Sequence, residues 1–339
     1  MTRSHLPPSL IHGFRNLNIP DETLVLALPD KVTDTSRGLS YFVKTTSSAA
    51  VGEVESLRVL EAAAPGFVPK PLGIFSHEGK TVMISEYFDL SYLPPKLEGS
   101  LARRLASMHD PENLASKSPN GMYGFDVPTH CGETEQVDNT WEKDWMVFYR
   151  DRRIMSLLDR IGDFEISKLG NTLCDLVIPF LLTDFHPAPV PVIIHGDLWS
   201  GNISANRQTS QPVLFDPSSY YGHNEVELGI MKMFGGRSGA FFEEYYHHRP
   251  KSEPHHTERI RYFIISLIKL YELYHHLNHT LIFGVSLLFL SPKDTKSLRI
   301  DIQSTCLIGG AQNFQGGYRN GAIKIMDELI CFVKKQTHA

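Results

Sequence analysis

The chain has 339 residues, a formal net charge of −5 and a 42% share of hydrophobic residues. Because single cores rarely grow beyond roughly 250–300 residues, this length predicts two lobes that share a cleft. The charge argues against a large nucleic-acid surface, and the most apolar stretch, residues 281–290, is too short to span a bilayer.

Short β-prone segments and one amphipathic helix dominate the first ninety residues. The β-branched and aromatic segments are bounded by turn residues, which is typical of strands. They are residues 23–28, 39–44, 68–74 and 81–88. Between the second and third segments, apolar side chains recur at helical spacing in residues 52–64, which predicts a helix with one buried face.

Helical patterns dominate the chain after a linker near residues 87–96. The predicted helices cover residues 97–109, 140–161, 166–182, 226–233, 237–246, 256–279 and 301 to the end. Two short strand-like runs, residues 190–194 and 212–215, interrupt them, and each is followed by acidic side chains. We therefore expect an α+β, bilobal fold, with a β-rich lobe over residues 1–90 and a helical lobe over residues 91–339.

The segment at residues 195–202, which reads HGDLWSGN, carries groups that phosphoryl transfer requires. Such transfer uses a carboxylate that orients the attacking hydroxyl, oxygen ligands for Mg²⁺ and a cation on the phosphates. Asp197 is the candidate catalytic base. Asn202 and Asp216 offer oxygens of the kind that Mg²⁺ prefers. We expect the two short strands to form a hairpin that places Asp197 and Asp216 at the mouth of one cleft.

The small lobe supplies the candidate nucleotide-binding groups. Lys44 ends the strand at residues 39–44 and could contact phosphates, with Glu53 or Glu55 on the next helix as its partner. Adenine could hydrogen-bond to the backbone where the last small-lobe strand closes, at Glu86, Tyr87 and Phe88. Together these groups predict ATP and Mg²⁺ as the cofactors, with the small lobe binding the nucleotide and the helical lobe holding the catalytic loop and the acceptor.

The catalytic motif resembles that of a known family. The pattern HGDxxxxN is typical of the kinases of small alcohols. A more specific match within that group lies at residues 214–228, which read LFDPSSYYGHNEVEL, and at Met233-Phe234-Gly235-Gly236. This combination resembles the fructosamine-3-kinase and ketosamine-3-kinase family, which has the protein-kinase-like fold of aminoglycoside and choline kinases. Further matches lie at residues 42–44, 52–57, 123–125 and 141–145, so the resemblance covers about residues 40–290.

The resemblance implies a role for each candidate residue. Asp197 would be the base, Asn202 and Asp216 would hold Mg²⁺, and Lys44 would contact the ATP phosphates with Glu53 as its partner. The linker at residues 86–88 would bind adenine. Family members phosphorylate the 3-hydroxyl of ketosamines, free or on protein lysines, which makes the adduct unstable and allows deglycation. The choice between ribulosamine and fructosamine stays open.

The chain departs from the expected pattern in the phosphate-covering loop. We place this loop at residues 29–39, where Gly38 is the single glycine and no cysteine occurs. Backbone contacts to phosphates would then be weak, or replaced by contacts from Ser36 and Ser40. A kinase for another small alcohol and a nucleotide-binding pseudoenzyme that acts as an interaction module remain alternative hypotheses.

Three residues near the catalytic loop are candidates for contacting the sugar and its amine: Trp199, His223 and Glu225. For His223 the alternative is a structural role at a helix start. Gly196 stands where protein kinases carry an arginine that reads a phosphorylated loop, so regulation of that kind is not expected.

The cysteines and histidines give no metal or disulfide pattern. Cysteine occurs at positions 131, 174, 306 and 331, without a CxxC pair, which fits reduced thiols and indicates no zinc site. His275 and His279 have helical spacing, but no acid or cysteine cluster accompanies them in the sequence. Residues 1–19 lack the apolar run of a signal peptide. We expect a cytoplasmic monomer without nucleic-acid or membrane partners.

Overall fold

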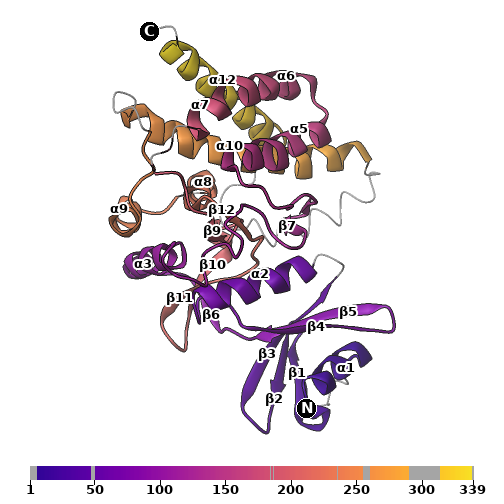
Figure 1. Cartoon of the computed structure of the whole chain (residues 1–339). Coiled ribbons are helices and arrows are strands. Elements are labelled where there is room, and N and C mark those ends of the chain that lie inside the picture. Colours follow the sequence, from indigo (N-terminus) through magenta and orange to yellow (C-terminus); the bar gives the residue numbers. More distant parts are fainter. Residues whose placement is uncertain are drawn as a thin grey trace.

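Five antiparallel strands form the sheet of the small lobe in a computed structural model that describes residues 6–46, 50–183, 185, 187–234, 236–254, 260–289 and 314–337. In spatial order they are β1 (Leu24–Leu28), β2 (Lys31–Asp34), β3 (Leu39–Thr46), β5 (Lys80–Glu86) and β4 (Pro71–His77). Side chains alternate between the two faces of the sheet. Figure 1 shows this sheet at one end of the molecule and the helical lobe at the other.

Two helices cover the two faces of the sheet. Helix α1 (Pro8–Asn16) buries Leu10 and Phe14 against Tyr41 and Val43 of β3 in a separate small core. Helix α2 (Ala50–Ala63) contacts β4 of the small lobe and also β7 and β9 of the larger lobe. The sequence analysis did not predict α1 or β2, since both are short.

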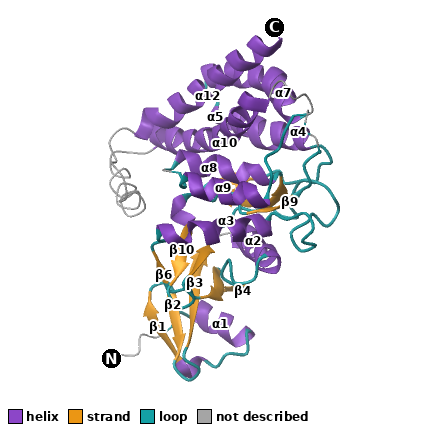
Figure 2. Ribbon diagram, turned by 90° about the vertical axis from the view of Figure 1, so that its left-hand side faces the viewer, coloured by secondary structure: helices purple, strands orange, loops and turns teal. Residues whose placement is uncertain are grey.

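The larger lobe is built from helices, which Figure 2 shows stacked beyond α2 and α3. Those on the way to the catalytic loop are α3 (Glu98–Met108), α4 (Trp145–Val147), the π-helical turns η3 (Phe148–Met155) and η4 (Leu173–Val177), α5 (Ser156–Ile161), α6 (Phe164–Thr172) and α7 (Ile178–Leu182). Those after it are α8 (Glu227–Met233), α9 (Gly239–His248), α10 (Ile260–Phe289) and α12 (Phe314–Thr337). Of the helices predicted at residues 256–279 and from 301 to the end, residues 256–259, 301–313 and 338–339 lie outside the described residues.

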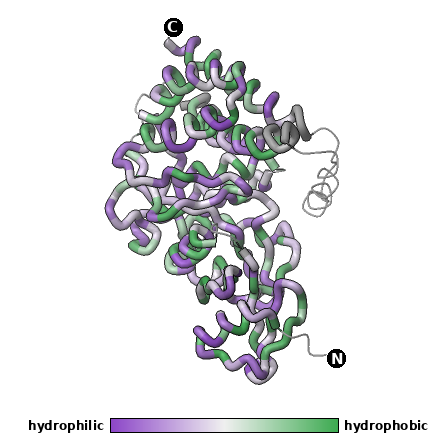
Figure 3. Tube along the Cα trace, turned by 90° about the vertical axis from the view of Figure 1, so that its right-hand side faces the viewer, coloured by the Kyte–Doolittle hydropathy of each residue, from purple (hydrophilic) through white to green (hydrophobic). Residues whose placement is uncertain are grey.

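The helical lobe has one continuous core. Figure 3 shows hydrophobic and hydrophilic positions alternating along its helices, as amphipathic packing requires. This core also takes in Val54, Leu57 and Leu60 of α2 and Met83 of β5, so the apolar packing continues across the junction of the lobes. Within the described ranges, no helix combines the length and the apolar character that a membrane crossing needs.

Short strands organise the loops between the lobes. β9 (Val192–Ile194) pairs with β12 (Tyr220–Gly222), and β7 (Thr129–Cys131) pairs with β8 (Thr134–Gln136). A third small sheet has the order β11 (Gln211–Leu214), β10 (Ile203–Asn206) and β6 (Leu90–Ser91). The predicted hairpin of residues 190–194 with 212–215 is therefore wrong, because each of these strands pairs with a strand that the sequence analysis did not identify.

The expected α+β, bilobal fold is confirmed, with a sheet lobe at the start of the chain and a helical lobe after it. The connection between them is held at β6, whose Ser91 and Leu90 pair with Ala205 and Asn206 of β10. This pairing fastens the linker to the sheet that carries the catalytic loop.

Candidate active site

His195 joins the two segments that carry the acidic side chains. It is fully buried at the end of β9, and burial lowers the pKa of its imidazole, so the ring is neutral. Nε2 donates to the carbonyl oxygen of Phe215 at 3.0 Å, and Nδ1 accepts from the N–H of Asp197 at 3.3 Å. The His195 carbonyl accepts from the N–H of Ser218 at 2.8 Å. One histidine therefore fixes Asp197 relative to the Asp216 segment.

Gly196 occupies a position that a side chain cannot share. Its φ of +83° lies in the left-handed region, and a Cβ there would come within 2.0 Å of the Ser218 carbonyl oxygen. The absence of the kinase arginine at this position thus has a steric reason in the packing of this loop.

Glu227 holds the catalytic loop through hydrogen bonds to its backbone, a role that the sequence analysis did not predict. Its buried carboxylate accepts hydrogen bonds from the backbone N–H groups of His195 and Gly196, the latter at 2.9 Å. Carboxylates that accept from backbone N–H groups make strong, directional hydrogen bonds. An acidic residue in the first turn of a helix is usually exposed and interacts with the helix dipole. The role of Glu227 in the catalytic loop is therefore visible only in the tertiary structure.

Asp197, Asn202 and Asp216 lie together at the junction of the lobes. The amide nitrogen of Asn202 donates to the Asp197 carbonyl oxygen at 2.9 Å and lies 3.5 Å from both the Asp197 carboxylate and the Asp216 carbonyl oxygen. Pairing of β10 with β11 places Asn202 beside Phe215, one residue before Asp216. Asp216 itself adopts a φ of +54°, and its exposed carboxylate faces the Lys44 ammonium of the small lobe.

The carboxyl group of Asp197 is strongly perturbed. Burial raises its pKa to about 7, and the nearby carboxylates of Glu227 and Asp216 act in the same direction. Hydrogen bonds from Cys131 and Asn202 oppose this rise. A carboxyl group in such surroundings binds a proton or a cation readily, which is a common property of catalytic positions.

Lys44 connects the sheet to this acidic group. Its ammonium lies 2.8 Å from the Glu53 carboxylate and 3.7 Å from the Asp216 carboxylate. Glu55 instead pairs with Arg58 on the surface of α2, so Glu53 is the partner of the lysine. Burial alone would lower the pKa of Lys44, but the two carboxylates outweigh it and raise that pKa. The predicted pairing with Glu53 is present.

The turn next to Lys44 is not the one that contains Gly38. Residues 29–39 include strand β2, and the N–H of Val43 donates to the carbonyl oxygen of Asp30 at 2.8 Å. The adjacent turn is therefore Pro29-Asp30. Gly38 lies at the opposite end of the β2–β3 hairpin, about 20 Å along the strand from Lys44 at roughly 3.3 Å per residue.

Ser36 and Ser40 are not placed to replace the missing glycines. Ser36 Oγ donates to Asp34 at 2.7 Å, and Ser40 Oγ shares a hydrogen bond with Thr33 Oγ1 at 3.1 Å. Both lie toward the far end of the hairpin, where they hold the turn together. Strand β2 separates both serines from the Pro29-Asp30 turn next to Lys44, so the structure gives no support to the prediction that Ser36 and Ser40 contact phosphates.

Glu86, Tyr87 and Phe88 lie at the junction of the lobes. The Glu86 N–H donates to the Lys70 carbonyl oxygen at 2.9 Å, while its side chain is exposed. Tyr87 and Phe88 are half-buried, and the ammonium of Lys31 lies 4.2 Å from the centre of the Tyr87 ring. The linker thus connects the lobes with the ammonium of Lys31, from β2, against its Tyr87 ring.

The three candidate substrate residues have different surroundings. Trp199 is partly exposed beside the loop, and its indole lies so close to Gly201 that a Cβ there would meet the ring at 2.3 Å. Gly201 is therefore required for close approach. His223 and Glu225 are buried, and His223 bonds to Tyr271 at 2.7 Å and Ser252 at 2.8 Å. This placement favours a structural role for the pair, and their contact with substrate stays a prediction.

Comparison with known proteins gives one consistent family. A sequence profile described as fructosamine kinase matches residues 30–293. The ketosamine-3-kinase of Mus musculus is 35% identical over 279 residues, which is 74% of this chain and 85% of the mouse protein. A chloroplastic protein-ribulosamine 3-kinase of Oryza sativa subsp. japonica is 36% identical over 305 residues, covering 87% and 74% respectively.

Solved structures show the same fold. A Haemophilus somnus protein that carries the fructosamine-3-kinase name superimposes with a TM-score of 0.64 at 19% identity, over 88% of this chain and 86% of that one. The choline kinase LicA of Streptococcus pneumoniae gives a TM-score of 0.53 at 11% identity, over 94% and 98%. At such low identities the likeness concerns the fold alone.

Proposed function

This chain belongs to the fructosamine kinase family, and on that premise we propose that it transfers the γ-phosphoryl group of ATP to the 3-hydroxyl of ketosamines. The acceptors would be ribulosamine or fructosamine adducts, free or on the lysines of glycated proteins, and the reaction would serve deglycation. The observation that supports the proposal most is the convergence of Lys44, Asp197, Asn202 and Asp216 at the junction of the lobes.

The donor set fits Mg²⁺. Asp216 presents an exposed carboxylate, and Asn202 uses its amide nitrogen in hydrogen bonds, which leaves its amide oxygen for a cation. Carboxylate and amide oxygens are the hard ligands that Mg²⁺ takes. The bound ion would neutralise charge on the ATP phosphates.

The protein's own groups would bind the nucleotide and orient the acceptor. Lys44, held by Glu53, would neutralise phosphate oxygens, and the linker at Glu86, Tyr87 and Phe88 would receive adenine. Asp197 would accept a hydrogen bond from the attacking hydroxyl and take its proton as the new bond forms. Trp199, which is partly exposed beside the loop, would contact the sugar, and a contact of His223 and Glu225 with the substrate stays a prediction.

Two alternative functions are a kinase for another small alcohol and a pseudoenzyme without catalytic activity. A kinase for choline or an aminoglycoside would use the same catalytic groups, and the shared fold of those kinases does not distinguish the substrates. A pseudoenzyme would draw support from the Pro29-Asp30 turn, which lacks the glycines that usually cover phosphates. The intact Asp197, Asn202 and Asp216 argue against it. A cytoplasmic location and a monomeric state remain predictions.

The test is a direct assay of the purified protein. It is incubated with Mg²⁺ and ATP and with fructosyl-lysine, ribulosyl-lysine, choline or an aminoglycoside, and the product is analysed for a 3-phosphate. Asp197→Asn should abolish turnover while ATP binding is retained. A 3-phosphate from neither ketosamine would overturn the substrate assignment, and turnover by the Asp197→Asn variant would overturn the base.

A further inference from the structure

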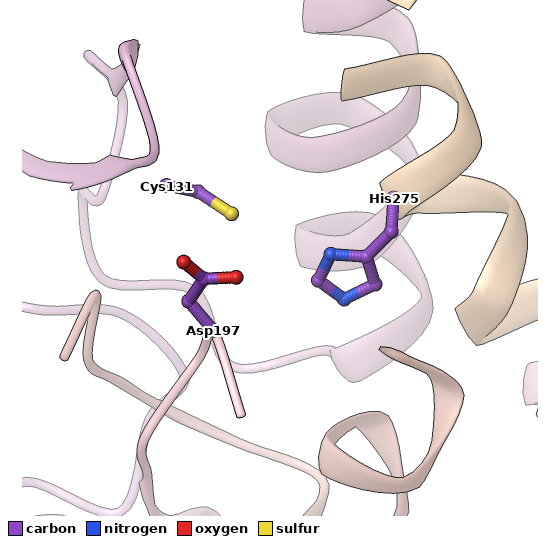
Figure 4. A group of neighbouring side chains, drawn as sticks. All are labelled: Cys131, Asp197 and His275. Atoms are coloured by element: carbon purple, nitrogen blue, oxygen red, sulfur yellow. The ribbon is translucent and has the colours of Figure 1, made fainter. Parts of the chain in front are cut away.

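Three side chains from distant parts of the chain meet beside the candidate base. Cys131 lies at the end of β7, Asp197 in the catalytic loop and His275 in α10. Their ligand atoms, one sulfur, one carboxylate oxygen and one imidazole nitrogen, all lie within 4.8 Å of one another. Figure 4 shows the three side chains pointing toward one another. The acid and cysteine that the sequence analysis did not find near His275 are thus supplied by the fold.

One potential metal ligand in this cluster, the Nδ1 atom of His275, has no hydrogen-bond partner among the described residues. His275 is 2% exposed, and its Nδ1 makes no hydrogen bond with any described residue. Buried polar atoms are nearly always paired, so such an atom calls for a specific explanation. In Figure 4 a ring nitrogen of His275 faces Cys131 and Asp197. Cys131 is itself almost completely buried, at 1% exposure.

The donor chemistry selects a metal other than Mg²⁺. Sulfur, imidazole nitrogen and carboxylate oxygen are the ligands of Zn²⁺, whereas Mg²⁺ takes oxygen ligands. In tetrahedral zinc sites such atoms lie roughly 3.5 Å apart, so the three side chains would close in by about 1 Å. A thiolate and a carboxylate together balance the charge of a divalent ion. Without a metal, burial and the Asp197 carboxylate raise the pKa of the Cys131 thiol well above its usual range, and the Arg153 guanidinium opposes this rise only in part, so the thiolate forms as the metal binds.

We propose that Cys131, Asp197 and His275 bind one Zn²⁺ ion, with an open fourth position, and that the bound ion inhibits the enzyme. The Cys131 thiol releases its proton to solvent as the sulfur–zinc bond forms. The carboxylate of Asp197 then coordinates the metal and cannot accept the proton of the acceptor hydroxyl. The inhibitory part rests on the proposed function, whereas the binding part does not.

The experiment titrates the metal-free full chain with Co²⁺, as a coloured substitute for Zn²⁺, in excess Mg²⁺ and without nucleotide. We expect one equivalent to bind with a sulfur-to-cobalt charge-transfer band, and Zn²⁺ to displace it. Cys131→Ser and His275→Gln should each weaken binding at least about tenfold, since even losing groups behind metal ligands costs about 10–100-fold. The matched controls Cys174→Ala, a buried thiol elsewhere, and His279→Gln should bind as the wild type does.

The outcomes separate the site from the activity. No stoichiometric band in the wild type, or an unchanged band in Cys131→Ser, overturns the metal site. A band without loss of turnover on adding Zn²⁺ overturns the inhibition. Zinc inhibition that weakens at least about tenfold in Cys131→Ser supports both parts. A protein that binds Co²⁺ with the band but phosphorylates no ketosamine supports the site and overturns the proposed function.

Discussion

Replacing Gly196 by alanine tests whether the catalytic loop is held as rigidly as its contacts indicate. The left-handed conformation costs an alanine about 1–2 kcal/mol. The new Cβ would also stand 2.0 Å from the Ser218 carbonyl oxygen, where ordinary contacts begin at 3.4 Å. The two segments must therefore separate by more than 1 Å, which disturbs the hydrogen bonds from Gly196 to Glu227 and from Ser218 to His195.

A displacement of about 1 Å at a catalytic group can cost about 100-fold in rate. We therefore expect Gly196→Ala to lower kcat at least about 100-fold and to destabilise the fold by more than the left-handed penalty alone. Activity is measured as ADP release with the preferred ketosamine, and stability by urea unfolding.

Gly162 provides the matched control for Gly196. It has a similar φ, +64°, at the end of α5, but no atom lies within 4 Å of its would-be Cβ. Gly162→Ala should lose about 1–2 kcal/mol of stability and keep its kcat. If the two variants lost equal stability and both kept wild-type kcat, the close approach of Ser218 would not hold the loop, and the reasoning would be refuted.

Three further substitutions test the groups around the loop. Glu53→Gln should lower kcat/KM for ATP about 10–100-fold because Lys44 loses its charged partner, whereas Glu55→Gln, on the surface of α2, should leave it unchanged. Glu227→Gln should lower kcat about tenfold or more, because the amide can no longer accept both backbone hydrogen bonds, and circular dichroism should show an intact fold. Burial raises the pKa of Glu225 to about 7, so its contribution to stability is fully present below pH 4.5 and is lost as the pH rises through 7. The free energy of unfolding of Glu225→Gln relative to wild type should therefore rise by about 3 kcal/mol from pH 4.5 to 8, and a pH-independent difference would contradict this pKa.

The sequence predicted the groups whose chemistry is local. The HGDLWSGN segment places Asp197 and Asn202 five residues apart, and Lys44 ends a recognisable strand, so residue type and spacing suffice. The residue pattern alone left Glu53 and Glu55 equivalent, since both acids lie on the first turns of the same helix, and the family resemblance alone named Glu53. The structure separates them, because the direction of Lys44 in the sheet is set by its register opposite Met83.

The groups that sequence analysis missed depend on contacts between distant segments. Glu227, at the start of α8, reaches the catalytic loop by accepting hydrogen bonds from the N–H groups of His195 and Gly196, more than thirty residues earlier in the chain. Cys131 of β7 and His275 of α10 likewise meet Asp197 only in the folded chain. The Pro29–Leu39 stretch was read as one loop because four residues, Lys31–Asp34, are too few for a clear strand pattern. Strand pairing then decides which turn approaches Lys44.

Helix α2 is fastened to the larger lobe in a way that limits how this enzyme can be switched. A Cβ on Gly52 would meet the Pro128 carbonyl oxygen at 2.3 Å, Ser56 Oγ accepts from the N–H of Ser219 at 3.1 Å, and Asn113 donates to the Ala63 carbonyl oxygen at 2.9 Å. These contacts lie along the whole helix, so it cannot swing away without breaking buried packing.

Glu53 therefore keeps Lys44 aligned before any nucleotide binds, and the short path from Asp216 through β12 to α8 leaves no long segment to order or release. Control through movement of α2 would cost several buried contacts at once. Regulation by a metal ion that binds the Asp197 carboxyl group requires no movement of α2. The cluster of Cys131, Asp197 and His275 lies at that group, so inhibition there is compatible with a rigid lobe junction.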